Sequence, residues 1–234
     1  MSDIARKLLG ISRTSTASAV SYTYNGLVFS DANLATYTFL SAPLGTATTD
    51  RLIVLPVFAL VESSRGSTDP IVTVGGVLAT KLVGPIIDSI SGRTYLYMAN
   101  VPSGTTGNIV VQVPISIARC YIPIYSVYGA DPTPLDLKTT FVESTVVNSL
   151  SLAVDTSVNG AVIAFSEFIV TGSPPTNWTN ITEDMDVVAE AGSSRRVSSA
   201  STLTSSTGTL TVTAAFSGTT TQGMEFGAVS FAPL

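Results

Sequence analysis

The sequence predicts an all-β protein: an antiparallel, jelly-roll-like β-sandwich behind a short N-terminal helical arm. Apolar and hydroxyl side chains alternate from residue 20 onward, as in Val20-Ser-Tyr-Thr-Tyr24 and Leu210-Thr-Val-Thr-Ala214. This period of two is typical of half-buried antiparallel strands. Turn-forming pairs such as Asn25-Gly26 and Asn159-Gly160 recur at short intervals. The 234 residues include 30 Ser and 32 Thr, and we expect about twelve to fourteen short strands.

The N-terminal arm, residues 1–16, contains the one convincing helical pattern. Ser2 is a suitable cap, and apolar residues share one face of the helix expected over residues 2–11. The arm has a net charge of +2 and the remaining chain has a net charge of −7. A helix this short is marginal alone, so two interpretations stay open. The arm is either a frayed terminus or a docking peptide that contacts a partner through Ile4, Arg6, Lys7, Leu8, Ile11 and Arg13.

Two nearly continuous apolar runs, Leu52–Val61 and Ala161–Phe165, predict central strands covered on both faces. Pro56 interrupts the first run and predicts a bulge or an edge position there. Cys120 lies in an apolar, aromatic stretch and is expected to be a buried small hydrophobe.

A weak internal repeat divides the body, residues 17–234, into halves of about 31–131 and 145–234. In each half an Arg-led strand is followed by Thr-Gly and an alternating strand: Thr106-Gly107 in the first half and Thr207-Gly208 in the second. Asp131-Pro-Thr-Pro134 is the natural joint. The repeat indicates two sandwich halves or one sandwich with pseudo-twofold symmetry, and the short joint favours one compact body. The matched segments in chain order are 37–39 with 150–154, 52–55 with 161–164, 72–74 with 177–179, 93–95 with 196–198, 106–113 with 207–213, and 124–131 with 227–234.

The composition excludes several classes of function. The chain has no His and one Cys, so neither a Ser-His-Asp triad nor a disulfide framework can form within it. The pI near 4.6 argues against a nucleic-acid partner. The sequence shows neither a signal-peptide pattern nor an apolar run long enough to span a membrane. We expect a chain that is made in a cytoplasm, is not an enzyme and uses no cofactor.

One candidate metal site remains. Glu183, Asp184 and Asp186 follow two Asn residues and could offer oxygen ligands to Ca²⁺. No Asp-x-Asp-x-Asp-Gly loop accompanies them, so a solvated acidic loop is the preferred interpretation.

The single tryptophan is the candidate for glycan binding. Trp178 follows Ser173-Pro-Pro175 and could either stack on a sugar ring or plug one end of the sandwich. Tyrosines cluster between residues 95 and 128, where they line the core or form a binding surface. Five further carboxylates leave a glycosidase open as a third alternative; they are Asp31, Asp50, Glu62, Glu143 and Glu167. Asp50 is expected to be a turn carboxylate paired with Arg51.

Several strand-and-turn motifs resemble a β-rich family of structural and accessory proteins of tailed phages and gene-transfer-like particles. They are Asp50-Arg-Leu-Ile-Val-Leu55, the segment 72–79, the segment 101–111, Trp178-Thr179 and Val229-Ser-Phe-Ala-Pro233. The resemblance covers most of residues 35–234 and implies a head decoration, head spike, fibre or tail-tip module. It implies no catalytic residues.

We therefore expect a non-enzymatic virion protein that is held on a capsid or tail by its N-terminal arm. A surface with few charges suits packing of identical copies, so we expect a homo-oligomer. The alternative is a β-sandwich module that recognises a host surface glycan.

Overall fold

The computed structural model describes residues 18–60, 69–87, 93–117, 119–143, 147–189, 194–218 and 223–234. Within these ranges the chain is all-β and antiparallel, as predicted, with no helix. The predicted helical arm lies outside the described residues. A search of the described part found no helix able to cross a membrane. The strands are β1 (Ser21–Ser30), β2 (Leu34–Pro43), β3 (Leu52–Leu60), β4 (Ile71–Val74), β5 (Val77–Leu78), β6 (Thr80–Ile87), β7 (Arg93–Asn100), β8 (Thr106–Ile117), β9 (Arg119–Tyr128), β10 (Asp136–Glu143), β11 (Ser149–Thr156), β12 (Gly160–Ile169), β13 (Asn177–Thr179), β14 (Thr182–Val188), β15 (Arg195–Thr204), β16 (Gly208–Ala215) and β17 (Gly223–Phe231).

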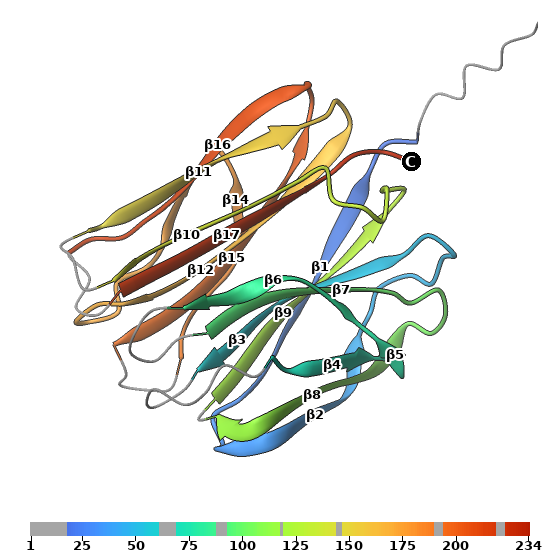
Figure 1. The fold of residues 1–234 in the computed structure, drawn as a ribbon. Coiled ribbons are helices and arrows are strands. Elements are labelled where there is room, and N and C mark those ends of the chain that lie inside the picture. Colours follow the sequence, from blue (N-terminus) through green and yellow to red (C-terminus); the bar gives the residue numbers. More distant parts are fainter. Residues whose placement is uncertain are drawn as a thin grey trace, which may run out of the picture.

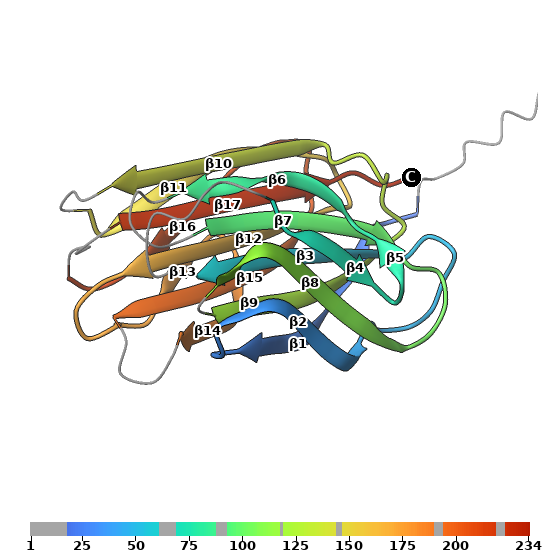
Figure 2. The same cartoon turned by 60° about the horizontal axis from the view of Figure 1, so that its bottom comes forward.

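These strands form four stacked sheets (Figures 1 and 2). Outer sheet 1 has the order β2-β8-β4-β5 and packs on inner sheet 1, β1-β9-β3-β7-β6. Inner sheet 2, β10-β17-β12-β15-β14, packs on the other face of inner sheet 1. Outer sheet 2, β11-β16-β13, closes the stack. The molecule is therefore two sandwiches placed back to back.

The two sandwiches have the same topology. The inner orders β1-β9-β3-β7-β6 and β10-β17-β12-β15-β14 correspond strand for strand, and so do β2-β8-β4 and β11-β16-β13. The segments matched in the sequence repeat fall on these equivalent strands. The first repeat has one additional strand, β5, within the described residues. The joint at 131–134 connects the last strand of one sandwich with the first strand of the next.

The sandwiches pack about a pseudo-twofold axis. β1 contacts β14 and β10 contacts β6, and β1 and β6 are the equivalents of β10 and β14. At the centre of this interface the ring of Phe58 on β3 meets the edge of Phe165 on β12, with centroids 6.4 Å apart. The central strands β3 and β12 are buried on both faces of their sheets, which explains the long apolar runs in both sequences.

Pro56 lies in a central strand, so the prediction of an edge position is wrong. β3 runs between β9 and β7 without a register shift, but its pairing with β9 is interrupted from Leu55 to Val57. The register places Pro56 opposite Pro123, and neither residue has an N–H to donate. A gap in the ladder, rather than a bulge, accommodates the two prolines.

Candidate functional site

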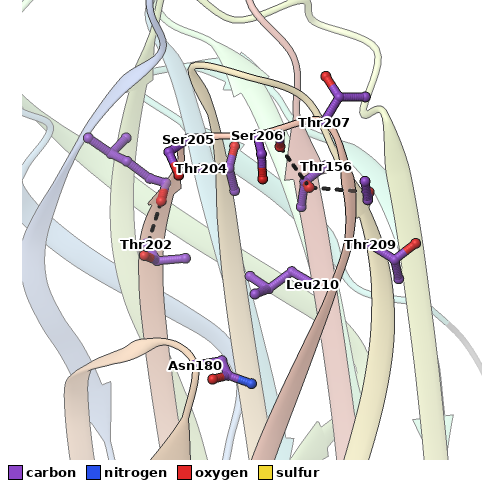
Figure 3. A pocket seen from close by; sticks show the side chains of 11 residues that line it. Thr156, Asn180, Thr202, Thr204, Ser205, Ser206, Thr207, Thr209 and Leu210 are labelled. Atoms are coloured by element: carbon purple, nitrogen blue, oxygen red, sulfur yellow. Dashed lines mark hydrogen bonds between the residues drawn. The ribbon is translucent and has the colours of Figure 1, made fainter.

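A surface hollow of about 370 Å³ lies at one end of the second sandwich, where β15 leaves the inner sheet and β16 enters the outer one (Figure 3). None of its lining residues is charged and most carry a hydroxyl group. The lining is Thr156, Asn180, Thr202, Leu203, Thr204, Ser205, Ser206, Thr207, Gly208, Thr209 and Leu210. The sequence did not point to this site. About a quarter of the chain is Ser or Thr, so the hydroxyl residues that line the hollow do not stand out from the others.

Hydroxyl-to-carbonyl hydrogen bonds hold the rim of the hollow. The Thr156 Oγ1 lies 3.2 Å from the carbonyl oxygens of Ser206 and Gly208 and shares its proton between them. The Thr204 Oγ1 donates to the carbonyl of Ser157 at 2.6 Å. The β11–β12 turn and the β15–β16 connection are therefore tied together by neutral groups.

In the first sandwich an arginine holds the corresponding loops together. Arg51 is completely buried at the start of β3, and its guanidinium donates to four backbone carbonyls of the surrounding loops. The repeat places Gly160 at the equivalent position. A Cβ on Gly160 would lie 2.5 Å from the Phe231 carbonyl oxygen, so no side chain fits there. The expected Asp50–Arg51 pair does not form, because Asp50 instead accepts a 2.7 Å hydrogen bond from the Gly129 N–H.

The hollow is open because β13 is short. In the first sandwich β4 pairs with β8 from Gln112 to Ile109. In the second sandwich β13 pairs with β16 only from Ala215 to Thr213. Beyond Thr179 the chain turns toward the inner sheet and begins β14 at Thr182. One edge of β16 pairs with β11. On the opposite edge, which faces β13, no strand of the described part of the chain lies beside residues Gly208 to Val212.

Two threonines direct backbone groups at this open edge. The Phe216 N–H donates to Asn148, on the β11 side of β16. Because successive residues of a strand bond to opposite neighbours, the odd-numbered residues Thr209 and Thr211 face the β13 side. The Asn180 side-chain amide donates to the Thr211 carbonyl at 2.8 Å, which agrees with this assignment.

The floor of the hollow is polar, whereas the equivalent positions in the first sandwich are apolar. Ala99 and Val101 are buried beneath β4 and β5 in the first sandwich. The register of β15 places Thr202 and Thr204 at the equivalent positions, and both line the hollow. The end of the second sandwich is thus suited to hydrogen-bonding groups rather than to an apolar plug.

Trp178 does not form an open stacking platform. Its half-buried indole packs against the core between inner and outer sheet 2, with the ring of Phe226 5.7 Å away. The indole N–H donates to the Ser198 Oγ at 2.8 Å. Because the ring packs inside the second sandwich, the structure favours the plug over the sugar-stacking platform, the two interpretations that the sequence left open.

The acidic residues Glu183, Asp184 and Asp186 lie on β14 and not in a loop, and they do not gather around a common point. Asp184 contacts Tyr125 and Ser201 between the two inner sheets. Asp186 forms a 2.6 Å ion pair with Arg196. Among the residues that the structure describes, no group of three metal-ligating side chains occurs.

The remaining candidates also serve structural contacts. Glu167 is buried between the inner sheets and pairs with Arg195 at 2.8 Å, and Asp31 accepts a hydrogen bond from Tyr121. Cys120 is buried, and desolvation raises the pKa of its thiol far above its usual range.

The tyrosines that sequence analysis could not assign line the core. Tyr95 and Tyr97 face outer sheet 1, and Tyr121 and Tyr125 face inner sheet 2.

Other candidate residues are not described. Glu62 and the side chain of Glu143 lie outside the described part, as do the docking candidates Ile4, Arg6, Lys7, Leu8, Ile11 and Arg13.

Comparisons with known proteins leave the family open. No protein-family profile and no curated protein matches the chain. One similar solved structure is a conserved protein of unknown function from Pseudomonas aeruginosa PAO1. It is 10% identical, with a TM-score of 0.33 over 92% of this chain and 90% of the other. A TM-score of this size does not establish a common fold.

Proposed function

We propose that the chain is a non-enzymatic structural protein of a phage-type particle, a decoration, spike or fibre component. Its N-terminal arm attaches it to a capsid or tail protein, and its outer face packs against further copies. The observation that carries this proposal is the chemistry of outer sheet 1. None of the residues in β2, β4, β5 and β8 is charged, although the chain as a whole carries a net charge of −5.

The exposed side of outer sheet 1 combines apolar and neutral polar side chains. Ile71 and Leu78 are 56% and 67% exposed, and Val110 lies between Thr38 and Thr73 in one cross-strand row. Symmetry repeats every surface group in each copy, so a charged face would bring like charges together. A neutral face with apolar contacts avoids that repulsion and supports close packing of subunits.

The alternative function is a glycan-binding module. Trp178 does not offer this module an open surface for stacking on a sugar ring, because the indole packs inside the second sandwich. Neutral hydroxyl groups at the hollow are the feature that a glycan would meet instead.

Cosedimentation with particles tests the proposal. The full chain is expected to pellet with capsids or tails from the lysate in which it is made. A Leu8→Asp variant, which places a charge on the apolar face that the sequence predicts for the arm, is expected to stay in the supernatant. Ser2→Asp adds the same charge off that face and is expected to pellet like the wild type. A wild-type chain that stays in the supernatant would contradict the proposal.

A further inference from the structure

The outer edge of β2 is a long strand edge without the usual protection. β2 is the last strand of outer sheet 1, and no strand of the described residues lies beside it on the side away from β8. Figure 2 shows β1 and β2 along the same side of the stack. Backbone groups at such an edge form a template for a further strand, and proteins usually guard them with charges, bulges or very short strands.

The other edge strands carry such guards. β6 has Lys81 and two internal register shifts, and β11 has Asp155. β10 and β14 carry charged side chains, whereas β5 has two residues and β13 has three. β1 is uncharged, but a bulge between Tyr24 and Leu27 breaks its edge, and it packs against β14. β2 has ten residues and no charge.

The middle of β2 directs backbone groups at the open edge. The Gly75 N–H donates to the Asn108 carbonyl, on the β4 side of β8. Because successive residues of a strand bond to opposite neighbours, the odd-numbered residues of β8 bond to β2, and their partners in the regular stretch are also odd-numbered. The even-numbered residues Thr36, Thr38 and Leu40 therefore turn their N–H and C=O groups away from β8.

We infer that this edge pairs with the β2 edge of a second copy of the chain, antiparallel and about a twofold axis. The pairing would join the two outer sheets into one continuous sheet. This inference rests on the self-association proposed above and deepens it, because it assigns to it a strand edge that is distinct from the exposed face of outer sheet 1.

Charge selects a second copy as the occupant. A twofold contact brings each surface group close to the same group of the other copy, and the chain has a net charge of −5. Pairing through β14 would bring Glu183 and Asp186 toward the carboxylates of the other copy. Pairing through β2 brings together only hydroxyl and apolar side chains.

The geometry of β2 also sets the register of the pair. The regular stretch begins at Thr36, after a register shift, and ends before Ser41, where φ is +52°. Full overlap of this stretch with its copy places Thr38 opposite Thr38 and Leu40 opposite Thr36. The Leu40 side chain is 73% exposed, the largest fraction among the large apolar side chains that the structure describes. Contact with the Thr36 methyl group of the other copy would cover part of it.

Disulfide trapping in the full chain tests the inference. The one natural cysteine, Cys120, is buried, so an introduced surface cysteine reports alone. Thr38→Cys is expected to form a covalent dimer on mild oxidation with diamide. Directly opposite residues of a hydrogen-bonded pair have Cα atoms about 5.5 Å apart, which a disulfide can span.

Thr36→Cys is the matched control, on the same strand and the same face. In the inferred register its two copies lie about 14 Å apart along the strand, so it is expected to stay monomeric on a non-reducing gel. No covalent dimer from Thr38→Cys, or equal amounts from the two variants, would overturn the inference.

Sedimentation velocity provides a second test without oxidation. Thr38→Lys places like charges opposite each other and is expected to raise the Kd of self-association roughly tenfold or more. An equimolar mixture with Thr38→Glu is expected to restore association, which also shows that both variants fold. Unchanged association of Thr38→Lys would overturn the inference. That result would leave cosedimentation with particles unaffected, whereas failed cosedimentation of a chain that still forms the Thr38→Cys dimer would contradict only the role on a particle.

Discussion

Replacement of Arg51 by methionine should destabilise the first sandwich more than any surface change of the same charge. The Arg51 Nε donates to the buried Val101 carbonyl at 2.8 Å, and the other nitrogens reach three further carbonyls at 2.8 to 2.9 Å. A hydrogen bond from a charged donor contributes roughly 1.5–3 kcal/mol when buried, and ordinary ones about 0.5–1.5 kcal/mol. The partly buried carbonyls regain water, so the expected loss is about 3–5 kcal/mol.

For a domain of this size that loss corresponds to a fall in Tm of roughly 10–15 °C. Thermal unfolding followed by circular dichroism measures it. Lys81→Met removes the same charge from the exposed ion pair with Asp69 and should cost less than about 1 kcal/mol. Arg51→Lys keeps the charge but not the planar fork and should fall between the two. An Arg51→Met variant no less stable than Lys81→Met would refute the assignment of Arg51 as the organiser of these loops.

Three further predictions follow from particular contacts. A Cβ on Gly227 would lie 2.3 Å from the Phe165 ring, so Gly227→Ala should cost about 1–3 kcal/mol, and Phe165→Leu should partly rescue it in urea unfolding; additive losses would contradict this. Desolvation raises the pKa of Asp184, so the native state holds that proton more tightly and stability falls as pH rises from the ordinary value of 3.8 through the raised pKa; Asp184→Asn should become progressively more stable relative to wild type over that window, and a flat difference would argue against it. Val110→Lys should weaken self-association in sedimentation velocity, whereas Leu203→Lys, away from outer sheet 1, should not; equal effects would remove this face as the contact.

Much of the fold could be predicted from local sequence. Period-two alternation identifies strands because neighbouring side chains point to opposite faces of a sheet, and the repeat of Thr106-Gly107 with Thr207-Gly208 falls on equivalent strands, β8 and β16. The stack of four sheets could not be predicted this way. A strand that is covered on both faces, such as β3, appears in the sequence only as an apolar run. The run indicates that both faces are buried, but it does not indicate which sheets cover them.

The candidate site was harder to predict for a different reason. It arises because no strand of the described residues lies beside β13's edge of β16 beyond Thr213. A sequence pattern indicates the strands that form, and it does not indicate a position in a sheet that stays empty. Comparison of the repeats offered one usable signal: Arg51 and Gly160 occupy equivalent positions at the starts of β3 and β12. The sequence left both interpretations of Trp178 open, because a lone tryptophan after two prolines is compatible with either a loop or a core position, and only the contact with Phe226 decides.

The most direct test of the proposed role is to quantify this chain by mass spectrometry in phage-type particles purified by density gradient from the cells that produce it. The account predicts that the chain travels with intact particles at a fixed copy number relative to the major capsid protein and withstands washing at moderate ionic strength. A chain found only in the soluble fraction, or in particles at a variable trace level, would contradict the account.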